Sequence, residues 1–182
     1  MKITAIILAG GKSSRMGEDK GLMLLNGEPM VQKIFNVVKE ITDTILIISN
    51  NKEYEQFGYQ VFEDEIKDKG PIAGIYTGLL HTSTPKNLLL SCDVPFVQVE
   101  LLKELIKLSD NFDITIPQKD NKTHQLIGVI DKSCLTSLKN NIDNNQLKLK
   151  TAYEALNLKV IDADQFDKKM FTNINSKDDI KA

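Results

Sequence analysis

Three glycines, one arginine and two lysines stand close together near the start of the chain, in the stretch LAGGKSSRMGEDK at positions 8–20. This stretch follows the apolar run ITAIILA, which is typical of a buried β-strand. Glycine lets backbone N–H groups approach an anion closely, and a loop that runs from a strand toward a helix commonly binds phosphate. We therefore expect residues 8–20 to bind a phosphate-bearing ligand.

Two familiar phosphate motifs do not match this loop. The sequence GKS at 11–13 would end a Walker A loop only if a glycine stood five residues before Gly11, and that position is Ile6. The dinucleotide-binding fingerprint needs a glycine two residues after Gly10, and that position is Lys12. The loop is therefore a glycine-rich anion loop of a third kind.

Arg15 is the only arginine among the 23 basic side chains of the protein. A guanidinium can hold a phosphate through two parallel hydrogen bonds, whereas a lysine acts as a point charge. The position of Arg15 inside the loop favours a contact with phosphate over the alternative that a single arginine stands there by chance. Lys20, at the end of the same loop, can neutralise charge that develops on a leaving pyrophosphate. Lys12 is equally consistent with a solvated surface lysine.

Asp93 closes the apolar run NLLLSC at 87–92 and is followed by Val94 and Pro95, which cannot extend the strand. An isolated carboxylate at the rim of a buried sheet is costly unless it has a partner. A Mg²⁺ ion held by one carboxylate and by substrate phosphates would be such a partner. The alternative is an aspartate that caps the turn before VQVELLKELI.

Seven short runs rich in Ile, Val and Leu alternate with helical patterns, and these elements must position the polar residues. The predicted strands are 3–8, 44–49, 59–63, 87–92, 112–117, 125–130 and 158–162. Helices are predicted to begin at Pro29, Pro71, Val99, Ser133 and Leu149. This alternation is typical of a three-layer α/β fold with a mostly parallel central sheet. The stretch KNNIDNNQ at 139–146 is expected to be a loop.

Polar clusters follow four of the predicted strands, at 8–20, 49–51, 63–71 and 92–95. Since ligands bind beyond the carboxyl ends of parallel strands, we expect these clusters to meet. Asp64 is either a solvated surface group or a ligand for a ribose hydroxyl. The turn GPIAG at 70–74 either receives an anion at the start of a helix or serves only for close packing. His124, which precedes an apolar strand, is either a residue of the functional site or a side chain packed at the edge of that strand.

Length and composition predict a single globular domain over residues 1–182, with 41% hydrophobic and 26% charged residues. The net charge of −2 gives no sign of a surface for nucleic acid or membranes, and we expect neither as a partner. No apolar run suits a transmembrane helix or a signal segment. Cys92 and Cys134 lack the spacing of a metal or disulfide site, so we expect core residues of a cytoplasmic protein.

The stretches LAGGKSSRMGEDKGLMLLNGEPM, GPIAG, SCDVPF and FTNINSKDD together resemble the molybdenum cofactor guanylyltransferases, the MobA-like branch of the nucleotidyltransferases. The resemblance runs from residue 3 to the C-terminus and is strongest to about residue 97. The opening pattern and CD-x-P also occur in cytidylyltransferases and sugar-phosphate nucleotidyltransferases, whereas LAGG with GPIAG is more specific to the guanylyl branch. The resemblance implies a Rossmann-like nucleotidyltransferase fold, with a nucleotide half at about 1–97 and an acceptor half at about 98–182.

The activity implied by this resemblance is the transfer of GMP from GTP to the molybdenum cofactor (molybdopterin), with Mg²⁺ as cofactor and pyrophosphate as the second product. Proteins that deliver the cofactor, and apoenzymes that receive it, are implied as partners. Two alternatives stay open. One is a related nucleotidyltransferase that uses CTP or a sugar-phosphate acceptor, and the other is a non-catalytic GTP-binding accessory protein.

Carried over by position, the resemblance assigns nucleotide binding to Leu8, Ala9, Gly10, Gly11, Lys20, Asn50, Asp64 and Asp93. Catalysis is expected from Arg15, Lys20 and Asp93, with Asp93 also holding Mg²⁺. The acceptor is expected to contact His124, Asn173 and Asn175. This chain departs from the family pattern at His124-Gln125-Leu126, where HPT is frequent, and at NNQLKLK, where arginines are frequent. Lys148 and Lys150 are the point charges available in their place.

Overall fold

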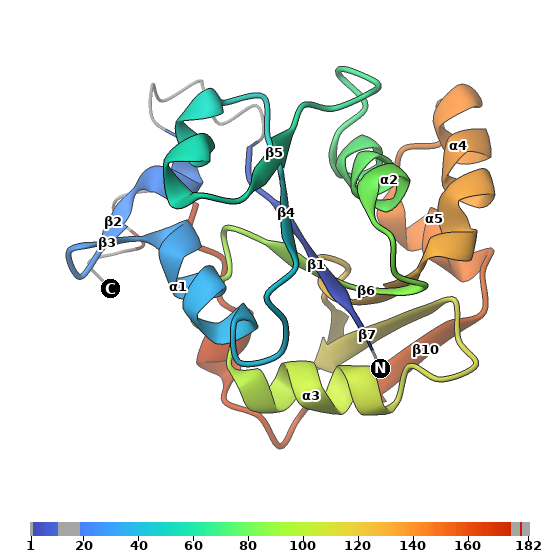
Figure 1. Ribbon diagram of the computed structural model, residues 1–182. Coiled ribbons are helices and arrows are strands. Elements are labelled where there is room, and N and C mark those ends of the chain that lie inside the picture. Colours follow the sequence, from blue (N-terminus) through green and yellow to red (C-terminus); the bar gives the residue numbers. More distant parts are fainter. Residues whose placement is uncertain (1, 11–18, 176–178, 180–182) are drawn as a thin grey trace.

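The computed structural model describes residues 2–10, 19–175 and 179 of the chain. Within these ranges an eight-stranded sheet has the order β10-β7-β9-β6-β1-β4-β5, with β8 paired to β7 (Figure 1). The sheet pairs are parallel except those that β9 makes with β6 and β7 and that β8 makes with β7. Its strands are β1 (Thr4–Leu8), β4 (Ile45–Ile48), β5 (Gln60–Phe62), β6 (Lys86–Ser91), β7 (Ile114–Lys119), β8 (Lys122–Thr123), β9 (Ile127–Asp131) and β10 (Leu158–Asp162). The predicted mostly parallel sheet is confirmed.

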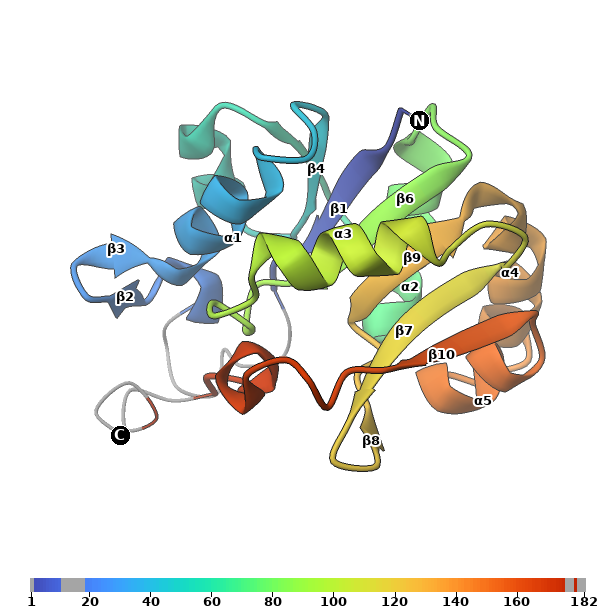
Figure 2. The same cartoon turned by 90° about the horizontal axis from the view of Figure 1, so that it is seen from below.

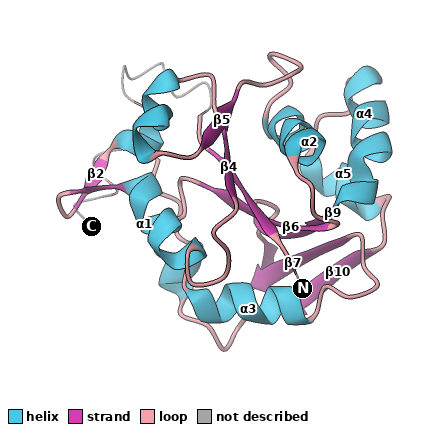
Figure 3. Ribbon diagram, in the orientation of Figure 1, coloured by secondary structure: helices cyan, strands magenta, loops and turns pink. Residues whose placement is uncertain are grey.

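Helices cover both faces of this sheet, which gives the predicted three layers (Figures 1 and 3). Successive residues of β1 explain the arrangement, since Ala5 and Ile7 belong to one buried cluster and Ile6 and Leu8 to another. The first cluster contains α1 (Met30–Val38) and α3 (Val99–Lys107), and the second contains α2 (Pro71–His81), α4 (Leu135–Asp143) and α5 (Leu149–Glu154). Figure 2 shows α3 lying across one face with α2 and α4 behind the sheet.

One predicted loop is wrong. Residues 139–143 continue α4 to Asp143. Leu138 and Ile142, four residues apart, are both buried, and this apolar spacing holds the polar stretch in a helix. Only the residues after Asp143 form a turn, in which Asn145 has a φ of 55°.

A short hairpin near the start of the chain was not predicted. It pairs β2 (Leu24–Leu25) with β3 (Glu28–Pro29) in antiparallel fashion. Asn26 and Gly27 connect the two strands with φ values of 58° and 82°, which is the conformation that Asn-Gly favours in two-residue hairpins. Ile174 packs against Leu25, so the end of the described chain lies on this hairpin.

The carboxyl ends of β1, β4, β5 and β6 lie at one edge of the sheet, because these strands are parallel neighbours. Strand β9 runs the other way, so its beginning lies at this edge too, and Ser91 N donates to Leu126 O at 3.0 Å. Three short 3₁₀ turns come after strands that end at this edge: η2 (Lys20–Leu22) after β1, η3 (Lys52–Phe57) after β4 and η5 (Lys168–Phe171) after β10. The turn η4 (Lys132–Cys134) follows β9 and lies at the opposite edge. No helix in the described part of the chain is long and apolar enough to span a bilayer.

Candidate nucleotide-transfer site

Asp93 lies in the turn that ends β6, and its carboxylate is only partly satisfied. Oδ2 accepts a hydrogen bond from Asn173 Nδ2 at 3.2 Å. Oδ1 is buried and has no hydrogen-bond partner among the described residues. The alternative of a turn cap finds no support within the described ranges, since the hydrogen bond that this carboxylate accepts comes from the Asn173 side chain and not from a backbone N–H of the turn. A buried carboxylate oxygen without a partner is costly, so this atom is suited to a cation or a hydrogen-bond donor from a ligand.

The segment Asn173-Ile174-Asn175 links Asp93 to Lys20. Ile174 is buried against Leu25 and Met30, and its backbone N–H donates to Asp93 O at 2.8 Å. In an extended segment, the side chains of Asn173 and Asn175 point to the face opposite to that of Ile174. Asn173 accordingly reaches Asp93, and Asn175 Oδ1 accepts from Lys20 Nζ at 2.7 Å. The two asparagines expected on the acceptor side therefore lie directly beside Lys20 and Asp93, two of the three residues expected in catalysis.

The chain leaves β1 through Leu8, Ala9 and Gly10. Leu8 O accepts from Cys92 N at 3.0 Å and Ala9 N donates to Ile48 O at 2.9 Å, so these two backbone groups are occupied within the sheet. Gly10 has a φ of +138°, a conformation that side chains rarely adopt, and a Cβ there would lie 3.4 Å from Ser49 Oγ. Gly11 and Arg15 lie outside the described residues.

Asn50 and Asp64 form a reciprocal pair at the ends of β4 and β5. Asn50 Nδ2 donates to Asp64 Oδ2 at 3.3 Å, and Asp64 N donates to Asn50 Oδ1 at 3.2 Å. Burial raises the pKa of the Asp64 carboxyl, and the hydrogen bond from Asn50 offsets part of that shift. Asp64 is therefore a partly desolvated carboxylate that Asn50 fixes in place, and not a freely solvated surface group.

The turn GPIAG serves close packing next to this pair. A Cβ on Gly74 would lie 3.2 Å from Leu8 Cδ2 and 3.5 Å from Asp64 Oδ1. A Cβ on Gly78, one turn later in α2, would collide with Ile6. The packing interpretation of these glycines is therefore confirmed, and an anion at the start of α2 stays a prediction.

Asp19 is a further polar centre, which the sequence did not reveal. Its Oδ1 accepts from the Tyr54 hydroxyl and from Gly21 N, and its Oδ2 accepts from Asn51 Nδ2 at 3.3 Å. The available signal was local, because an aspartate that precedes a turn commonly caps it. Nothing in the sequence pointed to Tyr54, since it lies thirty-five residues away and is completely buried.

His124 borders a small cavity near the end of β7. The cavity measures about 200 Å³ and is lined by Lys119, Asp120, Lys122, His124, Lys168, Phe171 and Thr172. The His124 ring lies 4.8 Å from that of Phe171. Burial, followed by the nearby charge of Lys122, lowers the pKa of His124. Lys148 directly precedes α5 and Lys150 lies in its first turn, and neither lines this cavity, so their expected role in place of the arginines stays a prediction.

A larger hollow of about 460 Å³ lies between the β2–β3 hairpin, α1 and the turn after Asp93. Its lining includes Glu28, Lys33 and Lys169, and none of the predicted site residues. The Glu28 and Lys33 charges pair with each other at 3.2 Å. The hollow therefore offers less for phosphate chemistry than the edge with Asp93 and Lys20.

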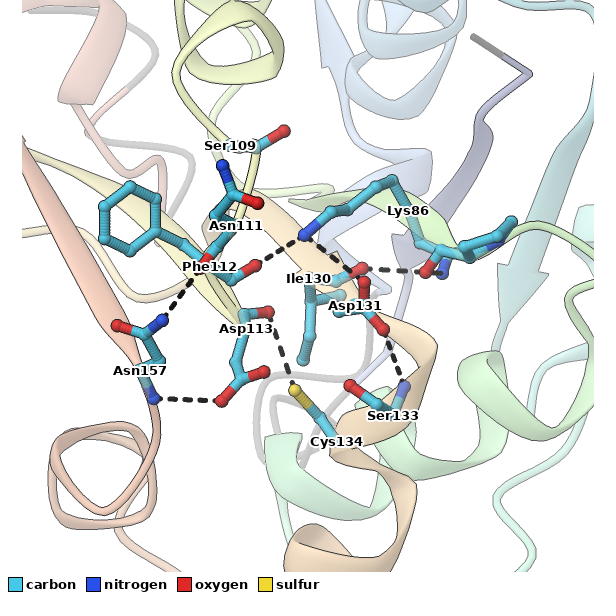
Figure 4. Close-up of polar contacts among 12 residues, drawn as sticks. Lys86, Ser109, Asn111, Phe112, Asp113, Ile130, Asp131, Ser133, Cys134 and Asn157 are labelled. Carbon is cyan, nitrogen blue, oxygen red and sulfur yellow. Dashed lines mark hydrogen bonds and ion pairs between the residues drawn. The ribbon is translucent and has the colours of Figure 1, made fainter.

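Polar groups at the opposite edge of the sheet are paired with one another (Figure 4). Lys86 Nζ lies 3.2 Å from Asp131 Oδ2, and Asp131 Oδ1 accepts from Ser133 N at 2.9 Å. Asp113 Oδ2 accepts from Asn157 N at 3.0 Å. Cys134 Sγ lies 3.5 Å from Asp113 O, and both Cys134 and Cys92 are buried and free, as expected. This edge is structural, whereas Asp93 keeps an unsatisfied oxygen.

The model of the MobA-like NTP transferase domain matches residues 5–171 of this chain. The chain belongs to the MobA-like NTP transferase family. The match extends from β1 to the end of η5 and so includes Lys20, Asp64, Asp93 and His124. Asn173 and Asn175 fall just after it, although their contacts join them to the same site.

Curated relatives support this membership over nearly the whole chain. A probable molybdenum cofactor guanylyltransferase of Flavobacterium johnsoniae is 39% identical, and the match covers 98% of this chain and 94% of the relative. One from Clostridium perfringens strain 13 is 31% identical with the same coverage. The molybdopterin-guanine dinucleotide biosynthesis protein A from Archaeoglobus fulgidus superposes with a TM-score of 0.82 at 25% identity, covering 98% of this chain and 95% of that one. The expected nucleotidyltransferase fold and the expected family are therefore both confirmed.

Proposed function

We propose that this NTP transferase moves GMP from GTP to the molybdenum cofactor and releases pyrophosphate. The observation that carries the proposal is the bridged pair of Lys20 and Asp93, held together through Asn173 and Asn175 with Asp93 Oδ1 left unpartnered. The names of the relatives indicate the base and the acceptor. A non-catalytic GTP-binding protein has no need for a buried carboxylate oxygen beside a positioned lysine.

The reaction is an in-line displacement at the α-phosphorus of GTP. An oxygen of the terminal phosphate of molybdopterin forms the new bond to phosphorus, while the bond from the α-phosphorus to the bridging oxygen breaks and its electrons leave with pyrophosphate. No covalent enzyme intermediate is needed, so catalysis consists of positioning and charge stabilisation. In this scheme the Lys20 ammonium, fixed by Asn175, offsets the negative charge that gathers on the phosphates.

The donor set fits a Mg²⁺ ion that is held mainly by its substrate. The described residues contain no group of three or more His, Cys, Asp or Glu side chains that could hold a metal by themselves. Mg²⁺ commonly binds one or two carboxylates together with substrate phosphates, and Asp93 with its free, buried Oδ1 suits that role. When bound, the ion would neutralise phosphate charge.

The remaining expected residues divide between the two substrates, in the nucleotide half (about 1–97) and the acceptor half (about 98–182). On the nucleotide side, the backbone around Gly10 and the paired Asn50 and Asp64 would contact the guanine and ribose of GTP. On the acceptor side, His124 and the lysines around its cavity suit a planar, phosphate-bearing molecule. The two buried, free cysteines support a reducing, cytoplasmic location, where delivery proteins and apoenzymes would meet the enzyme.

Release of pyrophosphate, measured with GTP, CTP, ATP and UTP in parallel and with or without molybdopterin, tests the proposal. We expect GTP to exceed CTP and ATP by at least about a hundredfold in kcat/KM, equivalent to roughly 2.7 kcal/mol, because the wrong base leaves polar groups of the site unpaired. A preference for CTP would move the protein to the cytidylyl branch. Transfer to a sugar phosphate would replace the acceptor, and absence of transfer with any nucleotide would leave a nucleotide-binding protein.

A further inference from the structure

Asp19 directly precedes Lys20, and its carboxylate joins segments that are distant in the sequence. Gly21 N donates to Oδ1 at 3.1 Å, so Asp19 caps the turn η2 on which Lys20 lies. The Tyr54 hydroxyl donates to the same oxygen, and Asn51 Nδ2 donates to Oδ2 at 3.3 Å. The backbone at Lys20 is therefore anchored to the residues that follow β4.

Tyr54 is placed as a permanent donor to this carboxylate. Its side chain is completely buried in η3, at 0% exposure. Burial, followed by the neighbouring Cys92 thiol and the hydrogen bond to Asp19, raises the pKa of the Tyr54 phenol. The hydroxyl is therefore suited to donate to Asp19. A buried hydroxyl fixed in this way is more specific than core packing requires, because phenylalanine would fill the same space.

The same hydroxyl lies where the Lys20 turn meets the Asp93 turn. Gly21 packs against Tyr54 and against Cys92, since a Cβ there would collide with the Tyr54 hydroxyl and would lie 3.1 Å from Cys92 Sγ. Cys92 immediately precedes Asp93, as Asp19 immediately precedes Lys20. The contacts among Tyr54, Asp19 and Gly21 therefore lie between the two turns that carry Lys20 and Asp93.

We propose that Tyr54 is a positioning residue for nucleotide transfer, which holds Lys20 in register with Asp93 through the carboxylate of Asp19. The inference rests on the proposed function for the role of Lys20 at the phosphates. A lysine carries its charge on a flexible four-carbon chain, so its preorganisation needs a fixed backbone as well as a contact at its tip. Asn175 supplies the contact at the tip, and Tyr54 supplies the fixed backbone.

Tyr54→Phe removes the hydroxyl and keeps the ring, and Tyr59→Phe is a matched control. Tyr59 belongs to the same aromatic cluster, with its ring 4.8 Å from that of Phe35, and its hydroxyl takes no part in the contacts of Asp19. We expect Tyr54→Phe to lower kcat on the order of tenfold with little change in the KM for GTP, because Lys20 is aimed less well at the transition state. Tyr59→Phe should stay within about twofold of wild type.

A double-mutant cycle separates positioning from general loosening of the fold. If Tyr54 acts through Lys20, Tyr54→Phe should cost less than about twofold in a Lys20→Met background. A purely structural role would give the same loss in both backgrounds and would overturn the inference. Where Tyr54→Phe fails to fold, Asn51→Ser replaces it in the cycle. Serine keeps the cap of η3 that Asn51 makes to Glu53 N, but is too short to reach Asp19.

Hydrogen exchange of the peptide that spans residues 19–23 gives a measurement that needs no substrate. Tyr54→Phe should accelerate exchange at the Gly21 amide, which donates to Asp19, while Tyr59→Phe should not. Unchanged exchange, or a kcat equal to that of wild type, would overturn the inference. A wild-type protein without transfer activity would instead contradict the proposed function, and the exchange data would still decide whether Tyr54 holds the Lys20 turn.

Discussion

Asp93→Asn separates a catalytic carboxylate from a structural one, because asparagine keeps the shape of the side chain. Its amide oxygen can still accept from Asn173, and the backbone contact from Ile174 N to residue 93 O is unaffected. The new Nδ2 would take the place of Oδ1, which has no hydrogen-bond partner in the described part of the chain. The substitution therefore removes a charge without opening a cavity.

The expected changes in stability and activity have different sizes. The new amide nitrogen, buried without an acceptor, costs about 1 kcal/mol, and the buried Oδ1 that it replaces already lacked a partner, so the free energy of unfolding should change by about 1 kcal/mol or less. With Asp93 in its proposed role toward Mg²⁺ and the phosphates, its loss should cost roughly 4 kcal/mol of transition-state stabilisation, or about a thousandfold in kcat/KM.

Urea unfolding and Mg²⁺-dependent release of pyrophosphate, measured on the same preparations, test this prediction. Asp131→Asn is the matched control, since Asp131 is paired with Lys86 and Ser133 at the opposite edge of the sheet. Although burial opposes it, the hydrogen bonds from Ser133 and Lys86 lower the pKa of Asp131 on balance. The control should lose about 1–2 kcal/mol of stability, because it gives up the pair with Lys86 and part of the cap at Ser133, and should keep its activity. Turnover of folded Asp93→Asn within tenfold of wild type would refute the reasoning.

Three further substitutions test other parts of the site. Gly21→Ala should destabilise the fold by about 1–3 kcal/mol, since its Cβ would collide with the Tyr54 hydroxyl, and an unchanged urea midpoint would contradict this. Burial and the charge of Lys122 lower the pKa of His124 from its usual 6.5, so the unfolded chain binds the imidazole proton more tightly than the folded protein does. The free energy of unfolding should therefore rise with pH up to about 6.5, and His124→Gln should flatten that rise in urea titrations from about pH 5 to 7. Arg15→Lys should lower kcat/KM by about tenfold or more if the guanidinium grips phosphate with two hydrogen bonds, and equal kcat/KM values would exclude that role.

The strands and helices were predictable because their signal is local. Each predicted strand appears within two residues of its expected ends, and α2 spans the predicted PIAGIYTGLLH. The short strands β2, β3 and β8 were not predicted, and residues 139–143 were wrongly expected to be a loop, because a polar composition concealed the spacing of Leu138 and Ile142. Composition reports average exposure, whereas the helix depends on which few residues face the core.

The sequence by itself determined which residues gather at one edge of the sheet. Parallel strands end at the same edge of a sheet, so Gly10, Asn50, Asp64 and Asp93 were expected to gather there, and the strand order of the structure makes β1, β4, β5 and β6 neighbours. The family patterns added the chemistry, since Lys20 and Asp93 stand in motifs typical of nucleotidyltransferases.

Only the tertiary structure decided how these residues are paired. Asn175 binds Lys20 across 155 positions of sequence, Asn173 binds Asp93 across 80, and Tyr54 reaches Asp19 across 35. Such contacts depend on the direction of single side chains after the sheet, the hairpin and the final segment have packed, and no local pattern encodes that direction. The tertiary structure also buries Asp93 Oδ1 without a hydrogen-bond partner among the described residues. Whether a buried polar atom forms a hydrogen bond depends on every group packed around it, which no local sequence pattern specifies.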